Sequence, residues 1–108
     1  MGASFLGELE HLLLAAAMRL GRGYGAELMR EVEIRTGRTV QVGSVYVTLD
    51  RLERKGFVTT SLGEPDPGRG GRAKRFVEVT PEGVRALAAH RGALLSIWEG
   101  LEPRLEDA

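Results

Sequence analysis

The sequence predicts a single, mainly α-helical domain that carries a two-stranded β-hairpin and ends in a long C-terminal helix. Three observations lead to this prediction. Apolar residues recur at helical spacing in four separate stretches of the chain. Two β-like segments, residues 57–62 and 73–79, flank a loop with four glycines and two prolines in ten positions, a composition that excludes regular structure there. The sequence Thr80-Pro81-Glu82-Gly83 then predicts the start of the final helix.

The overall composition limits the classes of protein to which the chain can belong. Its 108 residues fit one domain, and fifteen basic and fifteen acidic residues give a formal net charge of zero. Only the distribution of charge can therefore argue for a nucleic-acid partner. The absence of cysteine excludes disulfides and thiolate metal sites and is compatible with a reducing cytoplasm. No basic signal-peptide region is evident in residues 1–5, and the longest apolar run, residues 12–18, is far shorter than a membrane span of about twenty residues.

Two helices are predicted in the first third of the chain. The first spans residues 5–20 with Ser4 as its cap, and the second spans residues 24–36 with Gly37 as its C-terminal cap. The apolar stripe of the first helix is wide enough to be buried on more than one side. The expected core positions are Phe5, Leu6, Leu9, Leu12, Leu13, Leu14, Ala16 and Leu20 in the first helix, and Leu28, Val32 and Ile34 in the second.

The central stretch, residues 42–55, predicts an amphipathic helix around which the domain is organised. Val45, Leu49 and Leu52 form its apolar stripe, and Gly56 supplies the left-handed residue that ends it. Such a helix can pack on a core and still place side chains in the major groove of DNA, where arginine can bind a guanine edge and valine can contact a thymine methyl. The opposite face consists of Ser44, Val47, Arg51 and Arg54, with Thr48 at its shoulder.

The predicted hairpin carries a cluster of positive charge. A glycine-rich basic tip fits contact with DNA phosphates or the minor groove, because glycine lets the backbone approach closely. The alternative is a solvated hairpin with ordinary surface charge. On the returning strand, Phe76 is expected to point inward beside the core. Four basic residues lie between positions 69 and 75 with no acid among them: Arg69, Arg72, Lys74 and Arg75.

The final helix predicts a dimer. A small domain cannot cover so long an apolar row by itself, so a partner helix is the natural cover. The alternative interpretation is that the helix folds back on its own domain. Arg91 and Gly92 interrupt the row, where the helix is expected to kink or the seam to stop short. The row consists of Val84, Leu87, Leu94, Trp98, Leu101 and Leu105.

Several motifs resemble those of PadR-like winged-helix transcriptional regulators. The resemblance lies in Gly43-Ser44-Val45-Tyr46, Leu49 and the run from Arg51 to Val58, and extends to the Gly-Tyr-Gly sequence at residues 23–25 and to Thr80-Pro81-Glu82-Gly83. It covers about residues 9–87. Val47 departs from the usual proline, and Gln41 stands where a helix-capping Ser, Thr or Asp is expected, which affects how the helix starts and which bases it meets.

The resemblance implies a winged helix-turn-helix with a two-stranded wing, in which residues 1–80 bind operator DNA and residues 81–108 form a C-terminal dimerisation helix of the same compact unit. It also implies a cytoplasmic repressor acting as a homodimer. In multidrug-binding members of the family an aromatic residue on the last helix lines a pocket at the dimer centre, so Trp98 is a candidate to bind a flat aromatic effector. The alternative interpretation is that Trp98 packs in the core of the dimer and binds no ligand.

The candidate site residues follow from these arguments. Tyr24 and Tyr46 join the DNA set as phosphate contacts, the alternatives being packing within the helices for Tyr24 and a half-buried bridge between helices for Tyr46. Leu87, Leu94, Trp98 and Leu101 are the dimerisation residues. The predicted DNA-binding residues are Tyr24, Ser44, Tyr46, Val47, Thr48, Arg51, Arg54, Arg69, Arg72, Lys74 and Arg75. Arg54 and Lys55 are expected to reach the DNA backbone, and Asp50 to pair with Arg54 four residues on.

Other classes of function have less support. The main rival is a winged-helix module that binds a protein, kept open by the zero net charge and by acids near the DNA face, Asp50 and Glu53 among them. A metal sensor is disfavoured because cysteine is absent and the two histidines, His11 and His90, lie far apart in the sequence. No metal-ligand spacing, nucleophile motif or phosphate-binding loop predicts an enzyme or a cofactor.

Overall fold

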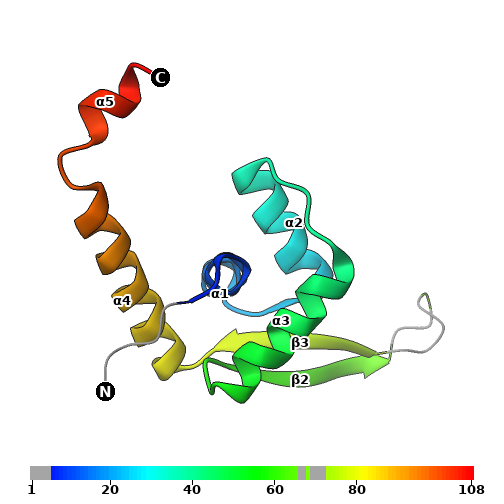
Figure 1. Ribbon diagram of the computed structural model, residues 1–108. Helices are drawn as coiled ribbons and strands as arrows, with labels where there is room; N and C mark the ends of the chain where they lie inside the picture. The colour runs from blue at the N-terminus through cyan, green and yellow to red at the C-terminus, as the bar shows by residue number, and fades with distance from the viewer. Residues whose placement is uncertain (1–5, 66–67, 69–72) are drawn as a thin grey trace.

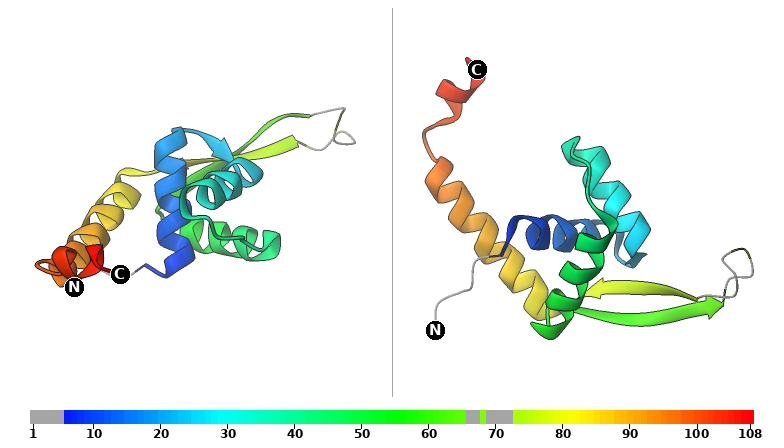
Figure 2. Two further views of the ribbon diagram at one scale, coloured as in Figure 1. Left: turned by 90° about the horizontal axis from the view of Figure 1, so that it is seen from above. Right: turned by 45° about the vertical axis from the view of Figure 1, so that its right-hand side comes forward.

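The computed structural model describes residues 6–65, 68 and 73–108, which form a mainly helical domain with a small antiparallel sheet (Figure 1). Helix α1 lies at the centre, with α2 and α3 on one side, the sheet beneath and α4 on the other side (Figure 2). The elements are α1 (Glu8–Leu20), β1 (Gly23–Tyr24), α2 (Gly25–Thr36), α3 (Val42–Arg54), β2 (Val58–Pro65), β3 (Ala73–Val79), α4 (Pro81–Trp98) and α5 (Glu102–Glu106).

The start of α1 differs from the prediction. The helix begins at Glu8, three residues later than expected, and the proposed cap Ser4 and the first helical residue Phe5 lie outside the described residues. Gly7 is extended, and the Glu10 carboxylate accepts its backbone N–H at 2.8 Å. A carboxylate three residues into the helix thus caps the chain there, so the helix starts where this bond forms.

The predicted ends of α2 and α3 are confirmed. Gly37 follows α2 with a φ of +71°, and Gly56 follows α3 with a φ of +79°. After α3, the N–H of Phe57 donates to the Leu52 carbonyl at 3.0 Å and the N–H of Gly56 donates to the Glu53 carbonyl at 3.0 Å. These bonds occupy carbonyls that the helix itself leaves open, so the chain can turn directly into β2.

The core forms where α1, α2, α3 and the sheet meet. Two of the expected core positions lie outside it: Leu20 is 38% exposed and Ile34 is 69% exposed, because both sit near helix ends. Leu9 and Leu12 are half-buried at its edge. The buried hydrophobic residues are Leu6, Leu13, Leu14, Ala16, Ala17, Leu28, Val32, Val45, Leu49, Leu52, Val58 and Val77.

The sheet has three strands in the order β1-β3-β2, one more than the sequence predicted. The short strand β1 pairs with β3 through Gly23–Val77 and Tyr24–Phe76, and this pairing joins the start of α2 to the wing hairpin. Val77 is fully buried, and Phe76 is half-buried on the opposite face, since neighbouring residues of a strand point to opposite sides. The prediction that Phe76 points into the core is therefore wrong.

Helix α4 begins as predicted. The Thr80 hydroxyl accepts the N–H of Gly83 at 3.0 Å and donates to the carbonyl of Gly56 at 2.6 Å, which ties this helix to the end of α3. A side chain on Gly83 would come within 2.2 Å of the Phe57 carbonyl oxygen, so only glycine fits the crossing. None of the described helices is long and apolar enough to cross a membrane.

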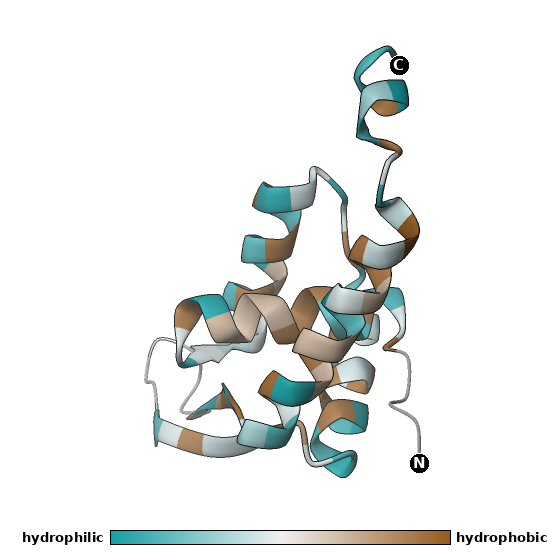
Figure 3. Cartoon of the chain, turned by 90° about the vertical axis from the view of Figure 1, so that its left-hand side faces the viewer, coloured by the Kyte–Doolittle hydropathy of each residue, from teal (hydrophilic) through white to brown (hydrophobic). Residues whose placement is uncertain are grey.

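The end of α4 corrects the predicted apolar row. The helix runs as one element through Arg91 and Gly92 but ends at Trp98. Gly100 then adopts a φ of +82°, and α5 starts at Glu102. Leu101 and Leu105 therefore do not continue the helix that carries Leu94 and Trp98. The outer part of α4 and all of α5 project from the body, with apolar segments recurring along them (Figures 1 and 3).

Candidate nucleic-acid interface

Helix α3 presents a polar and basic face to solvent. Its apolar stripe is buried, with Val45, Leu49 and Leu52 each at most 1% exposed. Thr48 is also buried, at 4% exposed, yet it lines a shallow depression together with Ser44, Val47 and Arg51, so its contact with DNA stays a prediction. It lies one helical turn from Val45 and Leu52 and therefore faces the core with them. The residues that remain on the exposed face are Ser44, Val47, Arg51 and Arg54.

A shallow depression lies where α3 starts, beside α1. Its lining includes Leu9, Gln41, Ser44, Val47 and Arg51, so the predicted groove residues and the start of α1 share one surface. Val47, the residue that replaces the proline, is 56% exposed there. An aliphatic side chain and an arginine therefore lie side by side on the presented face of α3.

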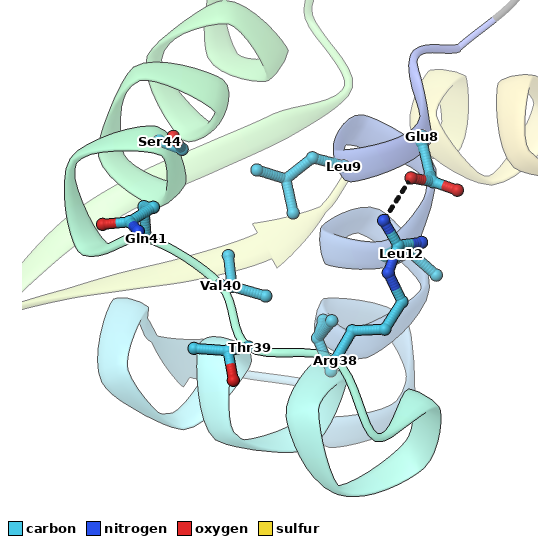
Figure 4. Close-up of a pocket in the computed structure, with 9 residues that line it drawn as sticks. Glu8, Leu9, Leu12, Arg38, Thr39, Val40, Gln41 and Ser44 are labelled. Atoms are coloured by element: carbon cyan, nitrogen blue, oxygen red, sulfur yellow. Dashed lines mark ion pairs between the residues drawn. The ribbon is translucent and has the colours of Figure 1, made fainter.

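The turn between α2 and α3 is held by acids of the neighbouring helices. Gln41 makes no side-chain capping bond at the start of α3. Instead, the Glu33 carboxylate accepts the N–H of Val40 at 2.9 Å, and Arg38 forms an ion pair of 2.7 Å with Glu8 of α1. Figure 4 shows this ion pair at the edge of a cavity of about 190 Å³ between α1 and the turn. Contacts with α1 and α2 thus replace the missing cap.

Two tyrosines lie at the start of α2. Tyr46 of α3 is 40% exposed, and its ring would lie 2.9 Å from a side chain at Gly25, so Gly25 makes room for the tyrosine. Tyr24 is half-buried and packs edge-on against Phe76, with ring centroids 5.8 Å apart. Both tyrosines are therefore partly packed and partly exposed. Packing within the protein and contact with a phosphate are compatible for each of them.

Cations cover the aromatic residues on the outer face of the sheet. The Lys74 amine lies 4.4 Å from the centre of the Tyr24 ring, and the Arg22 guanidinium lies 3.9 Å from that of Phe76. Sequence reasoning missed Arg22, although an arginine between two glycines just before the Gly-Tyr-Gly motif is a detectable signal. Lys74 and Arg22 therefore flank the start of α2, where the Glu27 carboxylate accepts the N–H of Tyr24 at 3.2 Å and the positive end of the helix dipole favours an anion.

Arg75 corrects the predicted basic cluster. Its guanidinium forms ion pairs with Asp50 at 2.9 Å and Glu53 at 2.7 Å, both on α3. Asp50 was expected to pair with Arg54, but the structure pairs it with Arg75. Burial alone would lower the pKa of Arg75, but the hydrogen bonds and charges of the two acids outweigh it and raise the pKa. The predicted tip residues Arg69 and Arg72 lie outside the described residues.

Lys55 also differs from the prediction. It was expected to reach the DNA backbone, but its amine binds the buried Glu10 carboxylate of α1 at 2.7 Å. Burial opposes ionisation of Glu10, yet hydrogen bonds from Lys55 and from the Gly7 N–H lower its pKa. The pair therefore fastens the end of α3 to the start of α1.

The predicted dimerisation residues divide into two groups. Leu87 is partly buried and packs against the core of its own chain. Leu94 and Trp98 line an open cavity of about 590 Å³ between α1 and α4, and Trp98 is 44% exposed. Leu101, in the bend before α5, is 41% exposed. The base of α4 is thus covered by the domain, whereas its outer part is not.

The two histidines meet at this same junction of α1 and α4. The rings of His11 and His90 lie 4.7 Å apart, and Nδ1 of the buried His90 accepts the Leu6 N–H at 3.4 Å. Burial and the neighbouring His90 lower the pKa of His11. Among the described residues no group of three His, Cys, Asp or Glu side chains could hold a metal ion.

The arrangement of α2, α3 and the β2–β3 hairpin is that of a winged helix-turn-helix. The family model described as Transcriptional regulator PadR-like family matches residues 13–89. The chain belongs to this family of transcriptional regulators, which confirms the resemblance drawn from the sequence motifs. The family match begins within α1, covers α2, α3 and the β2–β3 hairpin, and ends within α4.

Individual relatives support the family and the fold. Transcriptional regulator Rv3488 of Mycobacterium tuberculosis is 39% identical over 71 residues, which make up 66% of this chain and 62% of that protein. The chain thus spans less than two thirds of this curated relative. A PadR family regulator from Clostridium difficile R20291 superposes with a TM-score of 0.74 at 20% identity, covering 92% of this chain and 99% of the other. A putative regulator from Thermoplasma acidophilum gives 0.73 at 21%, covering 91% and 90%.

Proposed function

We propose that this protein is a dimeric, sequence-specific DNA-binding regulator that represses transcription. The observation that carries the proposal is the exposed face of α3, where Ser44, Val47, Arg51 and Arg54 are free of the core while the opposite stripe is buried. A helix fixed on one side and polar on the other suits the major groove. Membership of a family of transcriptional regulators supports the same function. Such a regulator works in the cytoplasm and needs no catalytic activity.

The residues of α3 divide by their reach. Arg51 hydrogen bonds to a guanine edge, Val47 contacts a thymine methyl, and Ser44 bonds a base or the adjacent sugar-phosphate. Arg54, near the end of the helix, contacts a phosphate. The structure supports this division because Arg51 and Val47 line the same depression and Arg54 lies on the exposed face one turn further along.

Backbone contacts come from the start of α2 and from the wing. Tyr46 and Tyr24 present their hydroxyls to a phosphate near the positive N-terminal end of α2, and Lys74 adds a positive charge beside Tyr24. We add Arg22 to this set because it lies on the same outer sheet face, over Phe76. Arg69 and Arg72, which the sequence predicts in the basic glycine-rich loop, extend the proposed phosphate contacts.

Residues 81–108 form the dimerisation segment, and residues 1–80 form the DNA-binding part of the same unit. Leu94, Trp98 and Leu101 contact a second copy, because the chain leaves them partly or largely uncovered. Leu87 takes part only at the edge, since it already packs on its own core. Two copies place two recognition helices in successive major grooves, about 34 Å apart.

The open cavity between α1 and α4 supports a small aromatic effector. Trp98 offers a flat surface on which an aromatic compound stacks, with Leu94 and Leu95 as apolar walls. Binding there changes the spacing of the two α3 helices and releases DNA. Tryptophan fluorescence of the protein titrated with a panel of flat aromatic compounds tests this step. No quenching across a broad panel counts against an effector.

The DNA proposal is tested by fluorescence anisotropy with DNA from the gene's own upstream region and a shuffled duplex of equal length. Tight binding of the native duplex alone supports a sequence-specific regulator. Arg51→Ala should remove the preference, a loss of about 1–3 kcal/mol in discrimination. Arg85→Ala is a control matched in charge, because Arg85 lies on α4, is 70% exposed and forms an ion pair with Glu82 of the same turn.

Repression is tested separately, by transcription in vitro from the bound promoter with and without the protein. A fall in transcript with added protein supports a repressor, and a rise contradicts one. The rival function, a protein-interaction module, is favoured by the acids Asp50 and Glu53, which neutralise Arg75 beside the recognition helix. No binding to either duplex at low salt would support that rival.

A further inference from the structure

One guanidinium joins three elements at the root of the wing. Arg75 of β3 uses Nη1 to donate to Oδ1 of Asp50 at 2.9 Å and Nη2 to donate to Oε1 of Glu53 at 2.7 Å. The second oxygen of Glu53 accepts the Thr60 hydroxyl of β2 at 2.7 Å. Both acids lie on α3, one turn apart, so a single network links α3 to both strands of the hairpin.

The position of this network decides what it can control. Thr60 pairs with Val77 across the sheet and Leu62 pairs with Arg75, so the network binds the half of the hairpin that lies nearest the domain. Beyond it, the strands have an irregular register between Leu62 and Pro65. The network therefore ties the root of the wing to α3 and sets the direction in which the outer hairpin leaves the domain.

The network also sets the charge next to the exposed face of α3. The side chains of Asp50 and Glu53 are 54% and 42% exposed, so without a partner they would place two negative charges beside a helix that approaches phosphates. Arg75 is 30% exposed and directs two donors at these acids. Its neighbour Lys74 points to the other face of the sheet, over Tyr24.

We infer that Arg75 is a positioning residue: it fastens the wing to the recognition helix and shields Asp50 and Glu53, and it does not bind DNA itself. The inference rests on the proposed DNA-binding function for its consequence. The inference removes Arg75 from the predicted DNA contacts, because Asp50 and Glu53 already balance its charge. Lys74 then remains as the DNA contact from this part of the wing. Arg75 acts through the two acids, so its effect must appear without DNA.

The first test is hydrogen exchange of the full chain without DNA, followed by mass spectrometry or NMR. Arg75→Gln should speed exchange of the β2 and β3 amides by about threefold, as expected for lost surface ion pairs. The double variant Asp50→Asn with Glu53→Gln breaks the network from the other side and should affect the same amides. Lys74→Gln, with the same change of charge, should leave them unchanged. Unchanged exchange in Arg75→Gln would overturn the inference.

The second test is the salt dependence of DNA binding. A residue that contacts a phosphate contributes about 0.9 to the log–log slope. Lys74→Gln should lower the slope by about that amount, whereas Arg75→Gln should weaken binding about tenfold with little change of slope, because it exposes two acids and loosens the wing. An Arg75→Gln slope that falls as far as that of Lys74→Gln would show a direct DNA contact and would overturn the inference.

The two tests separate the inference from the proposed function. If the wild-type protein binds no DNA, the proposed function fails, while hydrogen exchange still decides whether Arg75 fastens the wing. If the wild type binds DNA and Arg75→Gln behaves like Lys74→Gln in both tests, the inference about Arg75 fails and the proposed function stands. Arg75→Lys is a conservative variant that should restore part of the protection, since lysine can keep an ion pair but not the forked geometry.

Discussion

Helices α1 and α4 both carry apolar stripes, yet the stripe of α1 is buried and much of that of α4 is exposed. In α1, Leu13 and Leu14 are completely buried among α2, α3 and the sheet. In α4, Leu95 is 49% exposed, Ile97 74% and Trp98 44%. The difference arises because α1 lies between the other elements, whereas the outer part of α4 projects from the rest of the described chain (Figures 1 and 2). Similar patterns thus serve stability in one helix and, we propose, assembly in the other.

The largest expected effect is on the covered side of this comparison. Leu49→Ala, at a side chain 1% exposed, should lower the free energy of unfolding by about 2–5 kcal/mol because it leaves a cavity. Urea denaturation followed by circular dichroism measures the loss. Leu95→Ala is the matched control on α4. It should change only how the stability depends on protein concentration, because Leu95 is proposed to pack against a second copy. Equal losses independent of concentration would remove the distinction between the two helices.

The next effect concerns the uncovered side. Leu94→Glu should convert the proposed dimer to a monomer with a normal circular dichroism spectrum, and should weaken DNA binding about 100-fold by separating the half-sites. Light scattering after gel filtration measures the mass. Ser96→Glu adds the same charge about 200° around the helix, at an exposed position, and should change neither quantity. A wild-type monomer at micromolar concentration would contradict the proposed role of α4.

A smaller effect is expected where α3 is fastened to α1. Glu10→Gln should cost about 1–3 kcal/mol, because it removes the buried negative charge and leaves one acceptor oxygen for the two donors, the Lys55 amine and the Gly7 N–H. Thermal denaturation at neutral pH gives the change. Glu8→Gln removes a neighbouring carboxylate whose ion pair with Arg38 is exposed, and should cost no measurable stability. A loss in Glu8→Gln as large as that in Glu10→Gln would show that burial does not distinguish the two.

The smallest effect is a pH dependence at the contact between α1 and α4. The pKa of His11 is lowered by burial and by His90, and Glu8 opposes this only in part. The folded protein therefore binds fewer protons here than the unfolded chain, so this stabilisation is complete above a pH of about 6.5 and is lost as pH falls through the lowered folded pKa. Urea denaturation from pH 7.5 to 5.5 measures it, and His11→Asn should flatten the decline. A rise in stability toward pH 5.5 would contradict the assignment.

Sequence patterns predicted the elements whose signals are local. The glycines after α2 and α3 and the Thr80 cap of α4 depend on neighbouring backbone atoms, and all three occur as predicted. The site was predicted less completely. Burial of Thr48 and pairing of Arg75 with Asp50 and Glu53 depend on how α3 rotates against the sheet. Helical spacing shows which residues lie at the centre of the buried or the exposed face. It cannot place a residue such as Thr48 that lies at the boundary between the two faces.

The sequence by itself determined four helices, the hairpin, the glycines that end α2 and α3, the Thr80 cap of α4 and the family motif, because each rests on interactions within a few residues or on residue types in fixed order. Only the tertiary structure decided that β1 joins the sheet, that His11 meets His90, that Lys55 binds Glu10 and that the apolar row bends after Trp98. These contacts join segments up to 79 positions apart, His11 and His90 being the most distant. They form only when the core fixes the angles between the helices, and those angles are set by side-chain packing across the whole chain.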